Sequence, residues 1–327
     1  MLSEKRELGY LYMFLGVFLF ATIEITAKII ISFSKLQQHF FRMVLGVIII
    51  GIIIIARRNY SNPLQYFRKF WKFIIGAGII WITICSPIFF LALNLTRASN
   101  AALLLASNPI LVSLGSMLFL GEKRTKIKFI SVCIGFLGSF VVITELQFGS
   151  FNIEEFIGNS LIFISVFGYS IYTLISIFVT KKSMELEDKG GDSLQKIDLA
   201  LIFNFWGFLI GVICLSPVFL WELLIINPIT IVSQVDILLL FYLGIMTTGV
   251  AYILYTLGIN RVEPSRGVLL FYTKPLIAMF FAWLLLEESL TIYFIVGFLL
   301  IFVAVMLSEW EKFKLRQTKE ETDVTSS

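Results

Sequence analysis

Few ionisable side chains fall within the long apolar stretches of this 327-residue chain, and they mark where chemistry could occur. Glu24 is the only carboxylate well inside such a stretch, and Lys28 follows it by four positions, on the same helix face. Arg42 lies near the outer end of the next stretch, and Lys274 directly precedes Pro275 in a later one. A charge within a bilayer costs roughly 2.5–3.5 kcal/mol on insertion scales, so these residues suggest ligand binding or proton transfer.

The Lys274–Pro275 pair is the strongest candidate for a binding site. Proline removes a backbone hydrogen bond and opens the helix locally, which leaves a carbonyl free near the lysine. Asn108 precedes Pro109 in the same way. We expect the two polar residues to face each other across a central cavity. Alternatively, Lys274 only neutralises Glu24 and locks two helices together, although a purely structural pair could more easily have been apolar.

The other charged residues leave alternatives open. Glu24 could be a proton-coupling carboxylate, because a buried carboxylate can exchange a proton, or it could be the fixed partner of Lys28, Arg42 or Lys274. Arg42 could bind a ligand or complete an ion pair. Lys28 is expected to be structural, with its ammonium extended toward the membrane surface. His39, the only histidine, is expected to be solvated or hydrogen-bonded near the outer interface.

Aromatic residues make up 15% of the chain, so most must face lipid or other helices. Those with a polar atom near the middle of a stretch are candidates for a cavity wall. They are Trp81, Trp206, Tyr252, Tyr255 and Tyr272. The predicted substrate-binding set comprises Lys274, Asn108, Glu24, Arg42, Tyr252, Trp81 and Trp206.

The elements that position these residues are membrane-spanning helices. Charged residues are only 15% of the chain, against roughly 25% in soluble domains, and hydrophobic residues are 58%. The apolar runs are too long and unbroken for the alternating strands of an outer-membrane barrel. The sequence therefore predicts an all-α polytopic membrane protein with ten transmembrane helices. They span residues 10–32, 37–56, 73–93, 99–120, 127–144, 158–180, 198–221, 236–258, 267–286 and 292–308.

The chain carries one stretch twice, in residues 91–125 and again in residues 257–291. Each stretch is preceded by further matches, which extend the repeat to five helices per copy. An odd number of spans inverts the second copy in the membrane, the typical build of secondary transporters with a site between the halves. The identical pairs, 166 positions apart, are Asn94 and Asn260, Ser99 and Ser265, Pro109 and Pro275, Glu122 and Glu288, and Thr125 and Thr291.

Two repeat domains and a tail follow from this pattern. Residues 1–146 form the first five-helix repeat, residues 147–308 the second, and residues 309–327 a polar cytoplasmic tail that is expected to be disordered. With both termini cytoplasmic, 21 of the 26 basic residues lie in inward segments. This positive-inside pattern predicts an even number of spans in the plasma (inner) membrane.

The repeat resembles the EamA-type transporters of the drug/metabolite transporter superfamily over about residues 10–308. The motif is an Asn-Pro or Lys-Pro pair in the fourth helix of each copy, then Gly121-Glu122 or Glu287-Glu288 at its end. Gly297 and Ala304 complete it in the second copy, while Ser131 replaces the first glycine and Gly138 keeps the second in the first copy. The resemblance implies a transporter whose fifth and tenth helices pack together away from the pore. It also implies structural cap or loop contacts for the two glutamates rather than substrate contact.

The sequence predicts a secondary transporter, an exporter or exchanger of a small polar metabolite such as an amino acid or an organic anion. Two halves would rock about a central mid-membrane site. No Gly-x-x-x-x-Gly-Lys-Ser/Thr motif is present, so a proton gradient, exchange or downhill flow would supply the energy. We expect a monomer or homodimer in the lipid bilayer, without cofactor, metal or nucleic acid. The alternative is a non-transporting sensor or scaffold; an enzyme is not expected, because no catalytic constellation is present.

Overall fold

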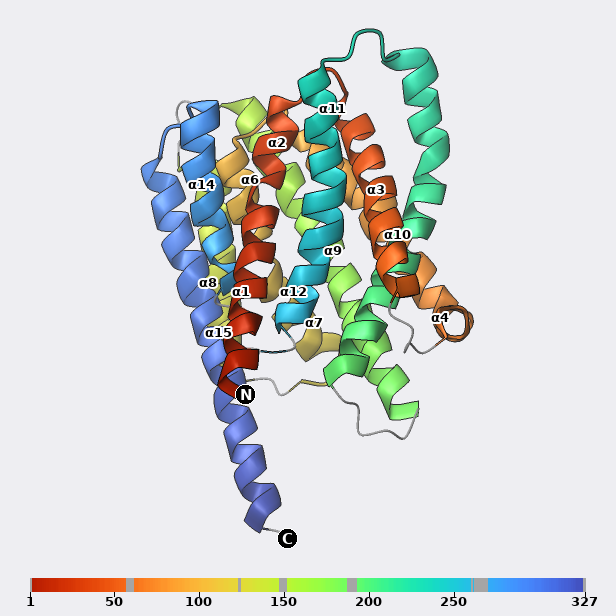
Figure 1. Cartoon of the computed structure of the whole chain (residues 1–327). Coiled ribbons are helices and arrows are strands. Elements are labelled where there is room, and N and C mark those ends of the chain that lie inside the picture. The colour runs from red at the N-terminus through yellow and green to blue at the C-terminus, as the bar shows by residue number, and fades with distance from the viewer. Residues whose placement is uncertain are drawn as a thin grey trace.

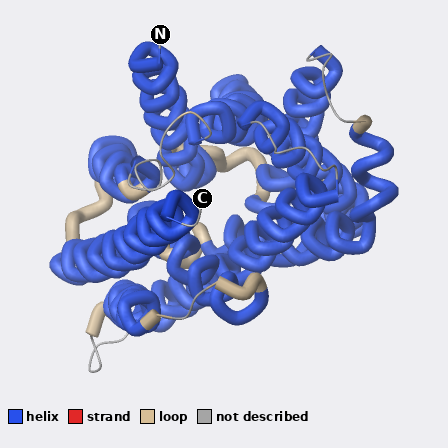
Figure 2. Tube along the Cα trace, turned by 90° about the horizontal axis from the view of Figure 1, so that it is seen from below, coloured by secondary structure: helices blue, strands red, loops and turns tan. Residues whose placement is uncertain are grey.

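The computed structural model describes residues 2–56, 62–122, 125–146, 152–186, 193–259, 261 and 270–325. All regular structure within these residues is helical (Figure 2). Large apolar side chains such as Ile55, Phe119 and Trp283 are exposed, as expected for a surface that faces lipid rather than water. The chain is therefore a multi-pass membrane protein.

Nine helical spans in the described part of the chain are long and apolar enough to cross a membrane. They are Glu7–Ile29, Lys35–Ala56, Pro63–Ala92, Ala98–Phe119, Lys126–Thr144, Ile153–Glu185, Asp198–Ile226, Gln234–Gly258 and Ile292–Trp310. The remaining predicted span, 267–286, is described only as α14 (Thr273–Leu286) and the short turn before it. Its 14 residues are fewer than the roughly 20 that a complete crossing needs, and residues 267–269 lie outside the described residues.

Two spans that contribute to the site are interrupted. The first divides at Thr22 into α1 (Leu2–Ala21) and α2 (Ile23–Ile29). The fourth divides into α6 (Ala98–Leu105) and α7 (Asn108–Phe119), where Pro109 occupies the first turn and needs no hydrogen-bond partner. At each break a side-chain hydroxyl donates a hydrogen bond to the carbonyl three residues earlier, which also accepts a backbone N–H.

The breaks before Asn108 and Lys274 are built alike. The Ser107 hydroxyl donates to the Leu104 carbonyl at 2.6 Å, and the Thr273 hydroxyl donates to the Leu270 carbonyl at 2.7 Å. These two hydrogen bonds lie 166 positions apart in the sequence, the same offset as the repeated stretch.

Two other spans contain π-helical segments near their middle. The third consists of α4 (Pro63–Gly78), η1 (Ile79–Cys85) and α5 (Ser86–Ala92). The eighth consists of α11 (Gln234–Phe241), η3 (Tyr242–Val250) and α12 (Ala251–Ile259). Adding the repeat offset of 166 to the residue numbers of η1 gives 245–251, which overlaps η3 at residues 245–250. Such segments occur often at functional sites.

The remaining helices are α3 (Lys35–Ala56), α8 (Lys126–Thr144), α9 (Ile153–Leu186), α10 (Ser193–Trp221) with η2 (Glu222–Ile226), and α15 (Ile292–Thr325). In Figure 1 they run side by side, and α1 begins at the end of the bundle from which α15 projects. Helices α8 and α15 pack closely: a Cβ on Gly138 would lie 3.1 Å from the Gly297 carbonyl oxygen, and one on Gly297 equally near that of Gly138. The predicted contact between the fifth and tenth helices is confirmed.

The prediction of a disordered tail is wrong. Helix α15 continues to Thr325 and extends beyond the bundle (Figure 1). The residues after Lys312 are mostly Lys, Arg, Glu, Gln and Thr, and the charged and amide members have high helix propensity. Because they prolong an existing helix, they need no new nucleus, so low hydrophobicity alone does not end it.

Candidate functional site

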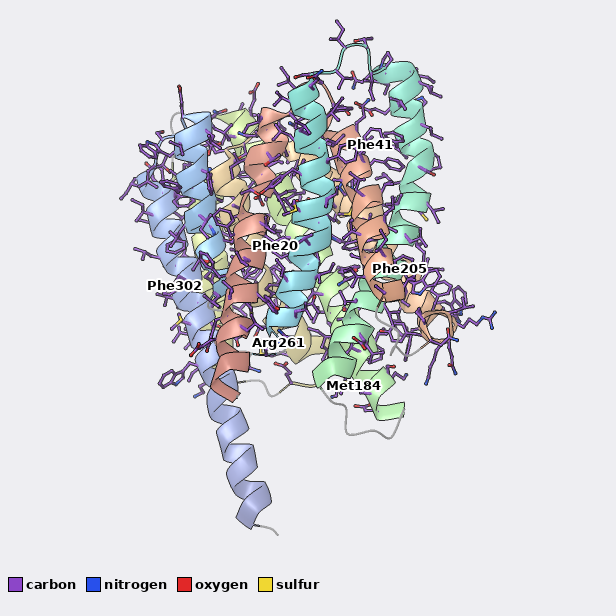
Figure 3. All side chains as sticks on the ribbon, in the orientation of Figure 1. Phe20, Phe41, Met184, Phe205, Arg261 and Phe302 are labelled. Carbon is purple, nitrogen blue, oxygen red and sulfur yellow. The ribbon has the colours of Figure 1, made fainter. Side chains whose placement is uncertain are left out.

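A cavity lies about halfway along the bundle, where Phe20 marks its level on α1 (Figure 3). It contains about 510 Å³ of empty space, including the part that opens to solvent. Its lining comes from α1, α2, α3, η1, α5, α6, α9 and α12, together with the turn and first residues of α14. The lining residues are Phe20, Ile23, Glu24, Arg42, Trp81, Ser86, Phe89, Phe90, Leu105, Tyr169, Tyr252, Phe271 and Lys274.

Two of the lining residues form a buried ion pair. The Lys274 ammonium donates to Glu24 Oε1 at 2.7 Å, and the two side chains are 1% and 0% exposed. Each residue follows a helix break by two positions, at Thr22 and Tyr272. Of the partners that the sequence left open for Glu24, Lys274 is the one in contact. The second carboxylate oxygen, Glu24 Oε2, accepts no hydrogen bond from the described protein atoms.

Arg42 is a second buried cation in the cavity, and no described carboxylate lies within ion-pair distance of it. Its side chain belongs to a residue that is 5% exposed, and its Nε has no hydrogen-bond partner among the described groups. The guanidinium carbon lies 4.7 Å from the centre of the Phe90 ring, a cation–π contact that holds the group against the cavity wall. A buried arginine without an acid is an unusual arrangement, because buried charges are normally paired.

His39, one turn before Arg42, is fully used in hydrogen bonds. Its Nε2–H donates to the Ile82 carbonyl at 3.0 Å, and Nδ1 accepts from the Ser86 hydroxyl at 3.2 Å. One donor and one acceptor suit the neutral imidazole. The prediction of a hydrogen-bonded histidine is confirmed, but the side chain is buried rather than at the outer interface. Because the Ile82 carbonyl belongs to η1, this histidine ties α3 to the π-helical segment.

Trp81 and Tyr252 both line the cavity, as the sequence predicted. The Trp81 ring packs 4.7 Å from Tyr169, and the Tyr252 ring packs 5.0 Å from Phe20, edge to face. Trp81 is 5% exposed, yet its indole N–H has no partner among the described atoms. A buried indole N–H usually finds an acceptor, so this donor is available to a ligand.

Asn108 and Trp206 do not line the cavity. The Asn108 amide oxygen accepts from the Ser170 hydroxyl of α9 at 2.7 Å, so this side chain connects α7 to α9. The Trp206 indole donates to the Pro63 carbonyl at 3.0 Å and its ring stacks on Phe67, so it packs α10 against the start of α4. The expectation that Asn108 and Lys274 face each other across a cavity is therefore wrong in this structure.

Several lining residues were not among the predicted candidates. Phe20 lies four positions, about one helical turn, before Glu24, so its position could have been inferred from that residue. Ile23 directly precedes Glu24 and could not have been inferred in this way. Ser86 directly precedes Pro87 at the π-helical segment, where backbone irregularity is itself a signal. Nothing in the sequence distinguishes Tyr169 or Phe271 from the many other aromatic residues.

Glu288, which follows α14, contacts the start of α6 and the end of α2. Its Oε1 accepts from the Ala98 backbone N–H at 2.7 Å, and Oε2 accepts from the Ser99 N–H and hydroxyl at 3.1 and 2.7 Å. The Lys28 ammonium lies 3.4 Å from Oε1. The carboxylate thus caps α6 and pairs with the end of α2, which confirms the structural role predicted for it. Lys28 is structural as predicted, but it pairs instead of extending to the surface.

Glu288→Ala should lower the free energy of unfolding by about 1–3 kcal/mol, because two backbone N–H groups of α6 lose their acceptor. Chemical unfolding in detergent micelles measures this change. The matched control is Glu185→Ala, which removes an exposed pair with Lys181 and should cost about 0.3–0.5 kcal/mol. Equal effects of the two substitutions would show that the cap at α6 contributes nothing.

Fold and cavity together define a polytopic helical membrane protein with a charged, aromatic-lined site. The sequence profile of the EamA-like transporter family matches residues 7–144 and again residues 156–310, so the chain belongs to this family. An uncharacterized transporter of Clostridium kluyveri is 24% identical over 98% of each chain. The uncharacterized transporter YyaM of Bacillus subtilis is 22% identical over 92% of this chain and 93% of that one. These findings support a membrane transporter.

A solved crystal structure shares the fold. It superposes with a TM-score of 0.61 over 96% of this chain and 99% of its own, at 16% sequence identity. At that identity the likeness concerns the arrangement of the helices alone.

Proposed function

We propose that the protein is a secondary transporter whose ten spans form two inverted five-helix halves around the cavity. The family profile matches twice, and the helix breaks and π-helical segments recur at the repeat offset. Helix α1 begins and helix α15 ends on the same side of the bundle (Figure 1), as an even number of spans requires. In this arrangement both termini are cytoplasmic and the chain resides in the plasma membrane.

The observation that carries the proposal is the Glu24–Lys274 ion pair. It joins the first half to the second at the cavity, in the middle of the bundle. A transporter of this build alternates by moving one half against the other around a fixed site. Uptake of a proton by Glu24, or arrival of an anionic substrate, would release Lys274 and so weaken the connection between the halves. Export or exchange of a small polar metabolite follows from such a cycle.

Alternating access has a test that requires no known substrate. We replace the three native cysteines by serine, introduce Leu105→Cys in the cavity wall, and treat sealed vesicles with a membrane-impermeant maleimide from either side. Leu105→Cys should react from both sides. The controls are two exposed positions, Ile231→Cys in the segment before α11 and Lys181→Cys near the end of α9. These two segments lie at opposite ends of the bundle (Figure 1), so each cysteine should react from one side only.

Labelling of the cavity cysteine from a single side, with both controls behaving as expected, would contradict alternating access. It would favour the alternative of a non-transporting sensor or scaffold, in which the cavity opens one way.

A further inference from the structure

The charges that line the cavity do not cancel. Glu24 contributes one negative charge, and Lys274 and Arg42 contribute two positive charges. His39 lies behind the wall, where its contacts with the Ile82 carbonyl and the Ser86 hydroxyl suit the neutral imidazole. The described lining therefore carries one uncompensated positive charge, on Arg42, because Lys274 is already matched by Glu24 at 2.7 Å.

The unsatisfied donors in this lining are the Arg42 Nε–H and the Trp81 indole N–H, both from residues that are 5% exposed. Buried polar groups are nearly always hydrogen-bonded, so these two donors, one of them on the unpaired guanidinium, would suit a ligand that supplies acceptors. A carboxylate supplies both the negative charge and several acceptor positions, and it matches the planar guanidinium in shape.

The rest of the lining is largely aromatic. Seven of its thirteen residues are Phe, Trp or Tyr, and they come from six different segments of the chain. Their rings offer faces and edges to a flat apolar group, and aromatic pairs of this kind prefer offset or edge-to-face contact. Such a wall selects a substrate with an aromatic body, since a short polar acid would leave most of it without contacts.

We propose, on the basis of the transport function above, that the substrate is an aromatic monocarboxylate whose carboxylate is recognised by Arg42 and whose ring packs on the aromatic wall. A monoanion neutralises the cavity. A zwitterion leaves the positive charge in place, and an amine adds a second one. The free Glu24 Oε2 does not alter this preference, because Lys274 already neutralises that carboxylate.

The test compares four compounds that share a phenylethyl group and differ in their charged groups: 3-phenylpropanoate, its neutral amide, zwitterionic phenylalanine and cationic phenethylamine. Propanoate serves as the acid without a ring. Binding is read as the rise in Tm of the full-length protein in detergent, because a ligand stabilises the state that it binds. Uptake of labelled acid into proteoliposomes gives a second readout. We expect 3-phenylpropanoate to raise Tm most and to be transported.

Arg42→Gln should weaken binding of 3-phenylpropanoate by roughly ten- to a hundred-fold, the cost of one charge-assisted hydrogen-bonding group. Arg68→Gln is the matched control, since it makes the same change at an exposed arginine of α4 and should leave binding unchanged. Trp81→Phe removes only the indole N–H and keeps the ring, so it tests the second donor even where the Arg42 variant is unstable.

Three results would overturn the proposal: stronger binding of phenylalanine or phenethylamine than of the acid, equal binding of acid and amide, or no binding of any compound to the wild type. The maleimide assay separates this failure from that of the transport proposal, because it reports alternation of the cavity without any substrate. If the cavity cysteine is labelled from both sides but none of the compounds binds, the proposed substrate class is refuted and the transport proposal is not.

Discussion

Lys274→Ala should abolish transport of 3-phenylpropanoate and lower the free energy of unfolding by about 3–5 kcal/mol. The large cost arises because Glu24, which is 0% exposed, keeps a buried charge with no partner. Chemical unfolding in detergent gives the stability, and uptake into proteoliposomes at a temperature where the variant is folded gives the flux.

A second variant separates binding from locking. The double substitution Glu24→Gln with Lys274→Met removes both charges and roughly preserves volume, so it should recover most of the lost stability. If the separation of Lys274 from Glu24 is a step of the transport cycle, flux stays absent in the double variant. Recovery of both stability and flux would show that the pair only locks α2 to α14. Unchanged flux in Lys274→Ala alone would remove Lys274 from the site.

Gly78→Ala should destabilise the protein by about 1–3 kcal/mol, while Gly76→Ala, two residues earlier in α4, should stabilise it by about 0.5–1 kcal/mol. A Cβ on Gly78 would lie 2.5 Å from the Gly207 carbonyl oxygen of α10, a backbone atom that cannot rotate away. A Cβ on Gly76 meets no atom within 4 Å. The midpoints of denaturant unfolding for the two single variants measure the difference.

The two glycines share a helix and differ mainly in what faces them, so the pair isolates the α4–α10 contact from helix propensity. Similar midpoints for both variants would mean that α4 and α10 separate at no cost. That outcome would contradict the close backbone approach described here.

Much of the bundle was predictable because a bilayer imposes one requirement, a long apolar helix, and the chain meets it repeatedly. Glu24, Arg42 and Lys274 could be identified for the same reason, since a charge in an apolar span is costly and conspicuous. Of the predicted spans, 267–286 is the one that begins in residues outside the described part of the chain.

The sequence could not predict which way a side chain turns. The repeat located the helix breaks before Asn108 and Lys274, but the hydroxyl of Ser170, on another helix, determines where Asn108 points. Likewise, Trp206 and Trp81 are both tryptophans within apolar stretches, and the sequence does not distinguish them. The Trp206 indole donates to the Pro63 carbonyl and packs between helices, whereas Trp81 lines the cavity. Contacts between distant segments decide both cases, and no local pattern encodes them.

The ion pair between Glu24 and Lys274 also has a consequence for synthesis. Its members are 250 residues apart, so at about 5–20 residues per second the ribosome needs roughly 12–50 s to deliver the second after the first. Throughout that interval the first span holds an acidic residue whose native partner does not yet exist. A nascent chain that stops short of Lys274 therefore keeps the cost of an unpaired carboxylate in its first span, roughly 2.5–3.5 kcal/mol on insertion scales.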